Sequence, residues 1–398
     1  MSKWRLLQGS LAFVFAISSG AAATASDLSA LDIHPLEYPI GQYMLHLGAH
    51  ANGSVYTADQ PADAGSGATR VTGATSLTAK IDRLYDNGIN IALKGTFNLY
   101  HDQLSGDIYG NKFVEKLYAD IATNLGRIEI GDTDGVGYQL AVTGPVVDED
   151  VSLDDSSVTF FRNPATKTAF VHFFPVETAL QSSLNYAKIS YYSPRLLGFE
   201  LATSFTPSEG KGVVPFAVSG PLVANRQDDI WEIVGSYVGY YGAFSYGAFG
   251  GLAVAHNAAK TALHAGLTDW AAGAEIDFAI SDSLKVAVGG AFHETNACAF
   301  NINSVFASGT TRASHFSTVL SDGRWSVGAE YSEGTAHAAG TAISTLGYAG
   351  SIGYKLNANW RVTAGWEQRN YRRETGTFYN GLGHINMDAA FLHVRFDV

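Results

Sequence analysis

The sequence predicts an all-β fold, a closed barrel of sixteen antiparallel strands that crosses a membrane. Three observations support this prediction. The composition combines 46% hydrophobic residues with only 16% charged residues. Apolar and polar residues alternate with a period of two along most of the chain, and short turns alternate with long loops. Together they indicate strands that present one face to lipid and the other to water.

The composition excludes several classes of protein. The charged fraction of 16% lies below the roughly 25% of soluble domains, and 43 glycines in 398 residues exceed the usual share. The single cysteine, Cys298, rules out a disulfide framework. Beyond residue 25, no apolar run approaches the roughly 20 residues that a membrane helix needs. If the chain spans a membrane, it does so with strands.

The N-terminus has the pattern of a secretory signal peptide over residues 1–25. Two basic residues precede an apolar run from Leu11 to Ile17, and small residues follow, ending Ala23-Thr24-Ala25. Cleavage is expected after Ala25, with Ala21-Ala22-Ala23 as a second candidate. Removing residues 1–25, which hold two basic residues and no acid, changes the formal charge from −12 to −14. We expect an exported acidic protein with one domain, residues 26–398, and no electrostatic basis for binding nucleic acid.

The period of two is clear from Ile89 to Tyr100. Ile91, Leu93 and Leu99 fall on one face, and polar residues such as Lys94 fall on the other. A helix would scatter these residues around its axis, whereas a strand separates them. The same separation recurs to the end of the chain, where Leu392, Val394 and Phe396 give a closing strand.

The connections between these segments alternate in length. The short ones contain residues that suit tight turns, and they lie at 86–88, 124–126, 193–198, 241–243, 281–283, 321–323 and 357–359. Longer stretches rich in Gly, Ser, Ala and Asp lie between them, for example at 58–69, 207–229 and 295–311. Counting alternating segments from Met44 gives about sixteen strands, an even number of successive hairpins.

Aromatic residues flank the short turns, as expected of a girdle at one membrane interface. They are Tyr85, Tyr191, Tyr192, Phe199, Tyr240, Tyr241, Phe244, Trp325, Tyr354 and Trp360. A soluble antiparallel sandwich or barrel is the alternative, because its strands also alternate. Such a fold would carry more charge on its water-facing side than this chain offers.

Residues 189–210, ISYYSPRLLGFELATSFTPSEG, resemble the Y-x-S-P-x-x-x-G-F hairpin of Gram-negative general porins, closest to the alphaproteobacterial trimeric porins. Residues 124–132, NLGRIEIGD, resemble the preceding hairpin of that family, and 84–88, LYDNG, its early turn. The resemblance implies a sixteen-stranded barrel with short periplasmic turns, a homotrimer in the outer membrane, and a third long loop folded inward. Family members usually end on an aromatic residue. This chain departs from that pattern, because it ends on Val398 at the position that the outer-membrane assembly machinery would recognise.

The third long connection, about residues 134–183, is the longest and is the expected constriction loop. It carries the acidic candidates Asp148, Glu149, Asp150, Asp154, Asp155 and Glu177. The polar strand faces offer a basic lumen wall made of Lys80, Lys94, Lys116 and Arg127. Carboxylates at a constriction attract cations, and a field between loop and wall would act on passing ions. The alternative is that the acidic run is a solvated outer loop tip.

Motifs for catalysis or metal binding do not appear in the sequence. We find no G-x-S-x-G elbow, no H-E-x-x-H motif and no phosphate-binding glycine loop. His46 and His50 share a strand face, but at about 13 Å they are too far apart to chelate one ion. The expected function is therefore passive diffusion of ions and small hydrophilic solutes, without a cofactor. A channel specific for a sugar or oligopeptide and a barrel hydrolase remain alternatives.

Overall fold

The structure is a computed structural model in which residue 33 and residues 36–60, 67–101, 113–154, 160–161, 176–208, 227–257, 266–298, 307–338, 341–373 and 384–398 are described. The predicted signal peptide and Asp155 lie outside these residues. The strands are β1 (Leu36–Ile40), β2 (Tyr43–Asp59), β3 (Thr69–Leu84), β4 (Asn90–His101), β5 (Val114–Thr123), β6 (Gly126–Asp132), β7 (Ala187–Tyr192), β8 (Phe199–Ser208), β9 (Gln227–Tyr241), β10 (Phe244–Asn257), β11 (Leu267–Ala279), β12 (Leu284–Cys298), β13 (Ala307–Asp322), β14 (Trp325–Ala338), β15 (Thr341–Lys355), β16 (Trp360–Arg373) and β17 (His384–Asp397). Two short helices, α2 (Val136–Gln139) and η3 (Glu149–Val151), lie between β6 and β7.

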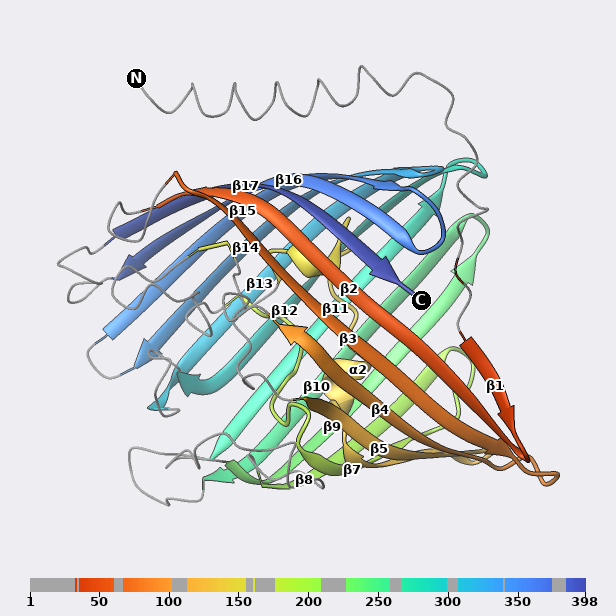
Figure 1. Ribbon diagram of the computed structural model, residues 1–398. Helices are drawn as coiled ribbons and strands as arrows, with labels where there is room; N and C mark the ends of the chain where they lie inside the picture. The colour runs from red at the N-terminus through yellow and green to blue at the C-terminus, as the bar shows by residue number, and fades with distance from the viewer. Residues whose placement is uncertain are drawn as a thin grey trace.

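The sixteen strands β2 to β17 form a closed antiparallel barrel (Figure 1). Each strand pairs with the next in sequence, and β17 pairs with β2 through ten residues, among them Phe391 opposite Tyr56. The prediction of a sixteen-stranded barrel is therefore confirmed. Because the barrel closes through β17 and β2, the described strands β2 to β17 each pair with a neighbour on both sides, as a sheet that spans a membrane requires. Among the described residues, no helix is long and apolar enough to cross a membrane.

The two ends of the barrel chain meet along one edge of β2. Strand β17 covers the part of β2 from His50 onward, and the short β1 covers residues 43–47 of the same edge. Between them, Ala49 and Val398 exchange two backbone hydrogen bonds of 2.9 Å. Asn359 donates from its side chain to the carbonyl oxygens of Ile33 and Asp397. The closing strand is thus paired with β2 from Asp388 to its end.

The predicted short turns gather at one end of the barrel and the longer connections at the other, with one exception at the second end, where only residues 339–340 separate β14 from β15. At the β3–β4 turn, Gly88 has φ +80°, a conformation that favours glycine, and Asn87 accepts a hydrogen bond from the amide of Ile89 at 3.2 Å. The other six turns likewise join an odd-numbered strand to the next even-numbered one.

Apolar residues face outward on the strands. Ile91 and Leu93 are exposed on β4, while the next residue, Lys94, faces the other side and turns into the barrel, where it pairs with Asp120. Most aromatic residues at the short turns are also exposed, including Tyr240 and Trp325. Tyr192 does not belong to this girdle, contrary to the sequence analysis. It is buried inside, where its hydroxyl donates to Glu129 at 3.2 Å.

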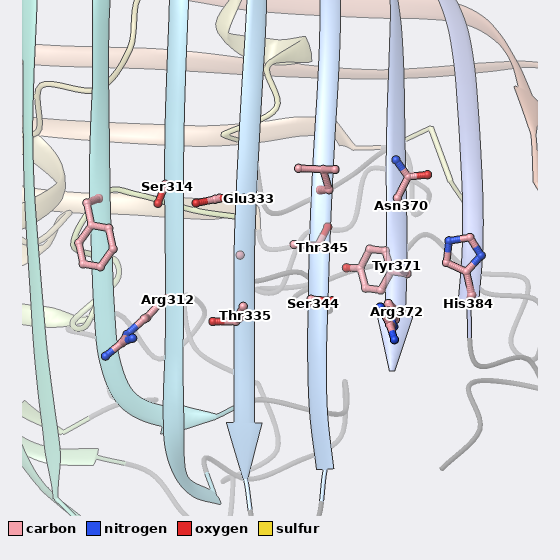
Figure 2. Close-up of a pocket in the computed structure, with 13 residues that line it drawn as sticks. Arg312, Ser314, Glu333, Thr335, Ser344, Thr345, Asn370, Tyr371, Arg372 and His384 are labelled. Carbon is pink, nitrogen blue, oxygen red and sulfur yellow. The ribbon is translucent and has the colours of Figure 1, made fainter. Parts of the chain in front are cut away.

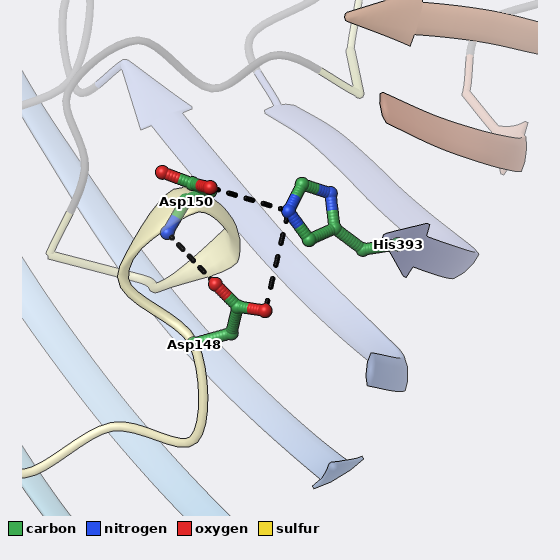
Figure 3. A group of neighbouring side chains, drawn as sticks. All are labelled: Asp148, Asp150 and His393. Atoms are coloured by element: carbon green, nitrogen blue, oxygen red, sulfur yellow. Dashed lines mark hydrogen bonds and ion pairs between the residues drawn. The ribbon is translucent and has the colours of Figure 1, made fainter. Parts of the chain in front are cut away.

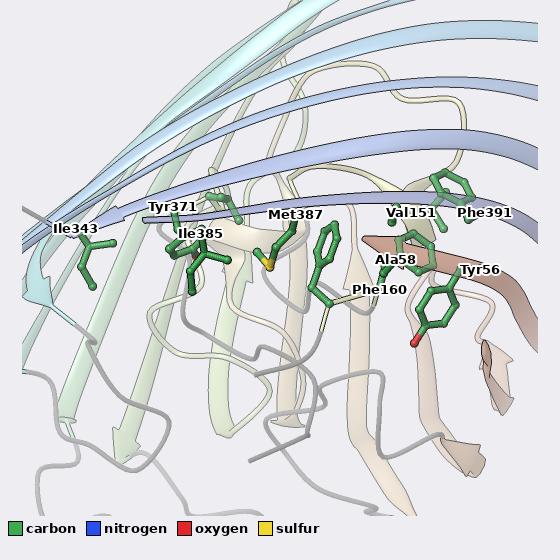
Figure 4. Packing of buried hydrophobic residues seen from close by; sticks show 12 residues of the cluster. Tyr56, Ala58, Val151, Phe160, Ile343, Tyr371, Ile385, Met387 and Phe391 are labelled. Carbon is green, nitrogen blue, oxygen red and sulfur yellow. The ribbon is translucent and has the colours of Figure 1, made fainter. Parts of the chain in front are cut away.

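The main apolar core lies inside the barrel, between the β6–β7 connection and the wall (Figure 4). Phe160 of the connection stacks on Phe391 of β17 with centroids 4.8 Å apart and contacts Tyr56 of β2 at 4.9 Å. Val151 and Met387 belong to the same cluster. This connection therefore folds inward and packs on the wall, which confirms the inward third loop.

Candidate channel constriction

The connection between β6 and β7, residues 133–186, is tied to the barrel wall in three sectors. The first lies on β9, where Glu232 accepts hydrogen bonds from the amides of Gly137 and Ser183, each at 3.1 Å. One buried carboxylate thus holds both arms of the loop. On β11, a side chain at Gly273 would collide with the carbonyl oxygen of Val142, so glycine lets the loop backbone approach the wall.

The second sector lies on β13 and β14. Glu330 accepts from the amide of Leu153 and the hydroxyl of Ser152, both at 2.9 Å, and contacts His315 at 3.1 Å. These partners satisfy a carboxylate that would otherwise be costly to bury. Because the loop donates to wall acids in two sectors far apart around the barrel, it spans the interior rather than lying along one side.

The third sector lies on the last two strands. Arg361 donates from Nη1 to the carbonyl oxygen of Val147 at 2.6 Å, and the Thr363 hydroxyl donates to Asp148 Oδ2 at 2.8 Å. Asp148 also begins η3, accepting from the amide of Asp150 at 3.4 Å. Here the loop supplies the acids and the wall supplies the donors.

Three predicted loop acids meet in this third sector, and they differ in exposure. The Asp148 side chain is fully buried, Asp150 is 21% exposed and Glu149 is 82% exposed. Arg395 Nη1 lies 3.7–3.9 Å from a carboxylate oxygen of each. His393 Nε2 lies 3.3 Å from Asp150 Oδ2 (Figure 3). We call these five residues the loop cluster.

The loop cluster sets the charge state of Asp150. Burial acts to raise the pKa of this carboxyl, but the hydrogen bond with His393 and the charge of Arg395 outweigh it and hold the pKa below its usual value. Asp150 is therefore a carboxylate across the neutral pH range. Glu149, the exposed member, is the one that can act on a hydrated ion in the lumen.

The other predicted loop acids have structural partners. Asp154 accepts from the amide of Thr178 at 2.9 Å and from its hydroxyl at 2.8 Å, which joins the two arms of the loop. Burial raises the pKa of Asp154 to about 6, although the hydrogen bonds from Thr178 act to lower it. Glu177 is half-buried, and its carbonyl oxygen lies 3.0 Å from His293 Nδ1.

The predicted basic wall residues all form ion pairs, with acids on the strands or at the start of the loop. Lys80 lies 3.4 Å from Asp82, and Lys116 lies 2.7 Å from Asp134. Lys94 pairs closely with Asp120. Arg127 lies 3.3 Å from Glu129 and 3.9 Å from Asp120. We call Lys94, Lys116, Asp120, Arg127 and Glu129 the β4–β6 network.

The basic side chains that meet the predicted loop acids come from other strands, and the sequence analysis missed them. They are His393 and Arg395 on β17 and His50 on β2. Their polar positions on alternating strands were a usable signal, because such residues face the lumen. No local pattern shows which lumen residues a loop so distant in sequence will contact.

A pocket of about 510 Å³ lies on the outer side of the barrel wall, over β12 to β17 and near the long loops. Its lining includes Phe292, Arg312, Glu333 and Arg372 (Figure 2). On β13, Arg312 alternates with the inward residues Ala313 and His315 and its side chain is 57% exposed, so the pocket opens away from the lumen.

A closed barrel of sixteen strands, apolar outside, with charged groups and a folded loop inside, defines an outer-membrane channel. The chain belongs to the Gram-negative porin family, whose sequence profile matches residues 10–374. No curated protein sequence matches it. As a member of this family, the protein is an outer-membrane channel for passive diffusion of solutes.

Solved structures similar to this chain share its fold at low sequence identity. OmpF of Salmonella typhi, solved with daunomycin, is 11% identical to this chain. The alignment covers 91% of this chain and 100% of OmpF, with a TM-score of 0.56. OmpT of Vibrio cholerae in a trimer form is 12% identical, with 89% and 99% covered and a TM-score of 0.54. An anion-selective porin of Comamonas acidovorans is 11% identical, with 89% and 100% covered and a TM-score of 0.53.

Proposed function

We propose that the protein is a general diffusion channel for ions and small hydrophilic solutes, with a preference for cations. The observation that supports this most directly is Glu149, whose carboxylate is 82% exposed on a loop tied across the barrel interior. A negative group at the narrowest part of a low-dielectric pore raises the local concentration of cations and opposes anions.

Size selection follows from the same loop. Its three anchoring sectors, through Glu232, Glu330 and Thr363, fix its path across the interior. A fixed loop gives a fixed aperture, so small solutes pass and larger ones are rejected without a gate or an energy source. The proposed mechanism needs neither an enzymatic step nor a cofactor.

We further propose that three copies assemble in the outer membrane. The structure of Vibrio cholerae OmpT cited above is a trimer form, and the outward residues of this barrel, such as Leu93 and Ile276, are apolar and exposed. In the proposed assembly, this surface is shared between lipid and neighbouring copies after insertion by the outer-membrane assembly machinery. The chain is also proposed to carry a signal peptide over residues 1–25.

The test is a planar-bilayer recording of the refolded protein under a salt gradient. We expect stepwise, ohmic conductance, in triplets for a trimer, and a reversal potential of the sign that marks cation preference. Correctly folded protein that stays electrically silent would reject the channel, and a reversal potential of the opposite sign would reject only the cation preference.

A further inference from the structure

The loop cluster brings nitrogen and oxygen donors from two separate segments to one point of the lumen wall. Asp148 precedes η3 and Asp150 lies in it, and His393 comes from β17. One ligand atom from each lies within 4.8 Å of the others (Figure 3). His393 Nε2 is 3.3 Å from Asp150 Oδ2 and 4.0 Å from Asp148 Oδ2.

The two carboxylates divide their oxygens between two neighbours. Their Oδ1 atoms face Arg395 Nη1, at 3.8 Å for Asp148 and 3.9 Å for Asp150. Their Oδ2 atoms face His393. The guanidinium thus orients both carboxylates from behind, and the Oδ2 atoms converge with the imidazole nitrogen on the other side.

The histidines of this region are also held from behind. His393 Nδ1 lies 2.7 Å from the hydroxyl of Ser54, and His50 Nδ1 lies 2.7 Å from Asp397 Oδ1. Each contact occupies Nδ1 and turns Nε2 toward Asp150, with His50 Nε2 at 3.7 Å from its Oδ2. A histidine that binds metal through Nε2 commonly has its Nδ1 held in this way by a hydroxyl, carbonyl or carboxylate.

We propose that Asp148, Asp150 and His393 bind a divalent transition metal ion, such as Zn²⁺, between the inward loop and the barrel wall. Tetrahedral ligands about 2.0–2.1 Å from zinc lie about 3.4 Å from one another. The contact of His393 with Asp150 has this length, and the contact with Asp148 needs to shorten by about half an ångström, a small rotation of one carboxylate.

The fourth position goes to water or to His50. Asn52 Nδ2 lies 3.3 Å from His50 Nε2, so His50 joins the ion when that amide turns away. Imidazole with carboxylate suits zinc, nickel or copper, whereas magnesium and calcium favour sites made of oxygen alone. The proposed selectivity is therefore for transition metals over the magnesium that surrounds the outer membrane.

Binding would have two consequences for the channel. It would pin η3 to β17 through coordinate bonds, and it would offset the negative charge of Asp148 and Asp150. If instead the cluster only forms ion pairs with a protonated His393, the same residues hold the loop without any metal, and zinc binding is not expected.

The test is calorimetric titration of the folded, tag-free protein in detergent with zinc chloride. We expect one ion per chain, and affinity at least tenfold lower in His393→Asn and in Asp150→Asn. The matched control is His256→Asn, because His256 lies 3.9 Å from Asp229 on the exposed end of β10 and has no part in the site. The control should bind zinc as the wild type does.

Two results with zinc would overturn the proposal. One is the lack of a stoichiometric zinc site in the wild type, and the other is unchanged zinc affinity in the folded Asp150→Asn variant. Because Asp150 is partly exposed, this variant decides the matter even if His393→Asn fails to fold. Titration with magnesium should give no comparable heat, and an equal affinity for magnesium would also contradict the site. Calorimetry reports binding whether or not the channel conducts, so this result stands apart from the proposed ion preference.

Discussion

The loop cluster and the β4–β6 network both hold buried charge in the lumen, but they are built differently. In the network, cation and anion come from neighbouring strands: Lys94 and Asp120 are diagonal neighbours across β4 and β5, and Asp120 stands opposite Glu129 on β6. In the loop cluster, Asp148 and Asp150 come from the loop and meet a wall more than 200 residues away.

This difference shows which charged groups can shift relative to the barrel wall. The network is fixed by backbone register, so its balance persists as long as the barrel does. The loop cluster depends on how the loop packs on the wall, which side-chain contacts alone decide. Changes in the network should therefore alter the field of the lumen without changing its shape, whereas changes beneath the loop should alter both.

The largest expected effect comes from removing the apolar contact beneath the loop cluster. Phe160→Ala deletes a buried ring that stacks on Phe391 and contacts Tyr56. Replacing a buried phenylalanine with alanine costs about 3–5 kcal/mol. We expect the loop to detach, with larger and noisier single-channel conductance, while the circular dichroism of the barrel stays that of a β protein.

The control for this variant is Phe316→Ala, because Phe316 is exposed on the outer face of β13. It should leave the conductance unchanged. Wild-type conductance in Phe160→Ala would show that the polar anchors on β9 and β14 hold the loop without the apolar cluster.

The second prediction concerns the β4–β6 network. Lys94→Gln removes the close partner of Asp120 and leaves Arg127 at 3.9 Å. A unit charge about 8 Å from an ion in an aqueous lumen is worth about 0.5 kcal/mol, or about twofold in a permeability ratio. We expect cation preference to rise by about this factor in salt-gradient recordings, with no change in pore size.

The matched variants sharpen this result. Lys94→Arg keeps the charge and should behave as the wild type, and the double variant with Asp120→Asn should restore the original ratio. If Lys94→Gln instead enlarges the pore, the network holds the loop in place in addition to setting the electric field of the lumen.

The sequence predicted the positions of the charged residues in the β4–β6 network far better than the contacts of the loop cluster. Period-two alternation places Lys94, Lys116 and Arg127 on the lumen face, and hairpin register brings Asp120 beside Lys94 and Arg127. The same rule would have separated Tyr191 from Tyr192, since adjacent strand residues face opposite sides. The girdle prediction failed at Tyr192 because it used distance from the turn and ignored alternation.

The contacts of the loop could not be predicted in the same way. Asp148 is fully buried and Glu149 is 82% exposed, although they are adjacent in an acidic run. The difference arises from Thr363 and Arg395, which reach Asp148 from strands near the C-terminus. No local periodicity encodes such pairs, because side-chain packing inside the barrel selects them after the barrel has closed.

The third prediction separates charge from anchoring within the loop cluster. Glu149→Gln removes the exposed carboxylate, which lies 3.7 Å from Arg395. Exposed pairs contribute about 0–1 kcal/mol, so thermal unfolding should not change measurably. Cation preference should fall by up to about twofold. Asp148→Asn is the contrasting variant, because it replaces a buried anchor and should lower loop stability as well.

The smallest effect is expected from Asp154, because burial raises the pKa of its carboxyl group to about 6. The folded loop binds a proton here more tightly than the unfolded chain does. The contribution of this group to stability is therefore fully present below about pH 4 and is lost as the pH rises through about 6. Asp154→Asn keeps an acceptor for Thr178 and removes the titration. Conductance noise, recorded between about pH 4 and 7, reports how firmly the loop is docked. In the Asp154→Asn variant, this noise should no longer depend on pH. If that dependence persists, the titrating group lies elsewhere, and Asp154 only joins the two arms of the loop.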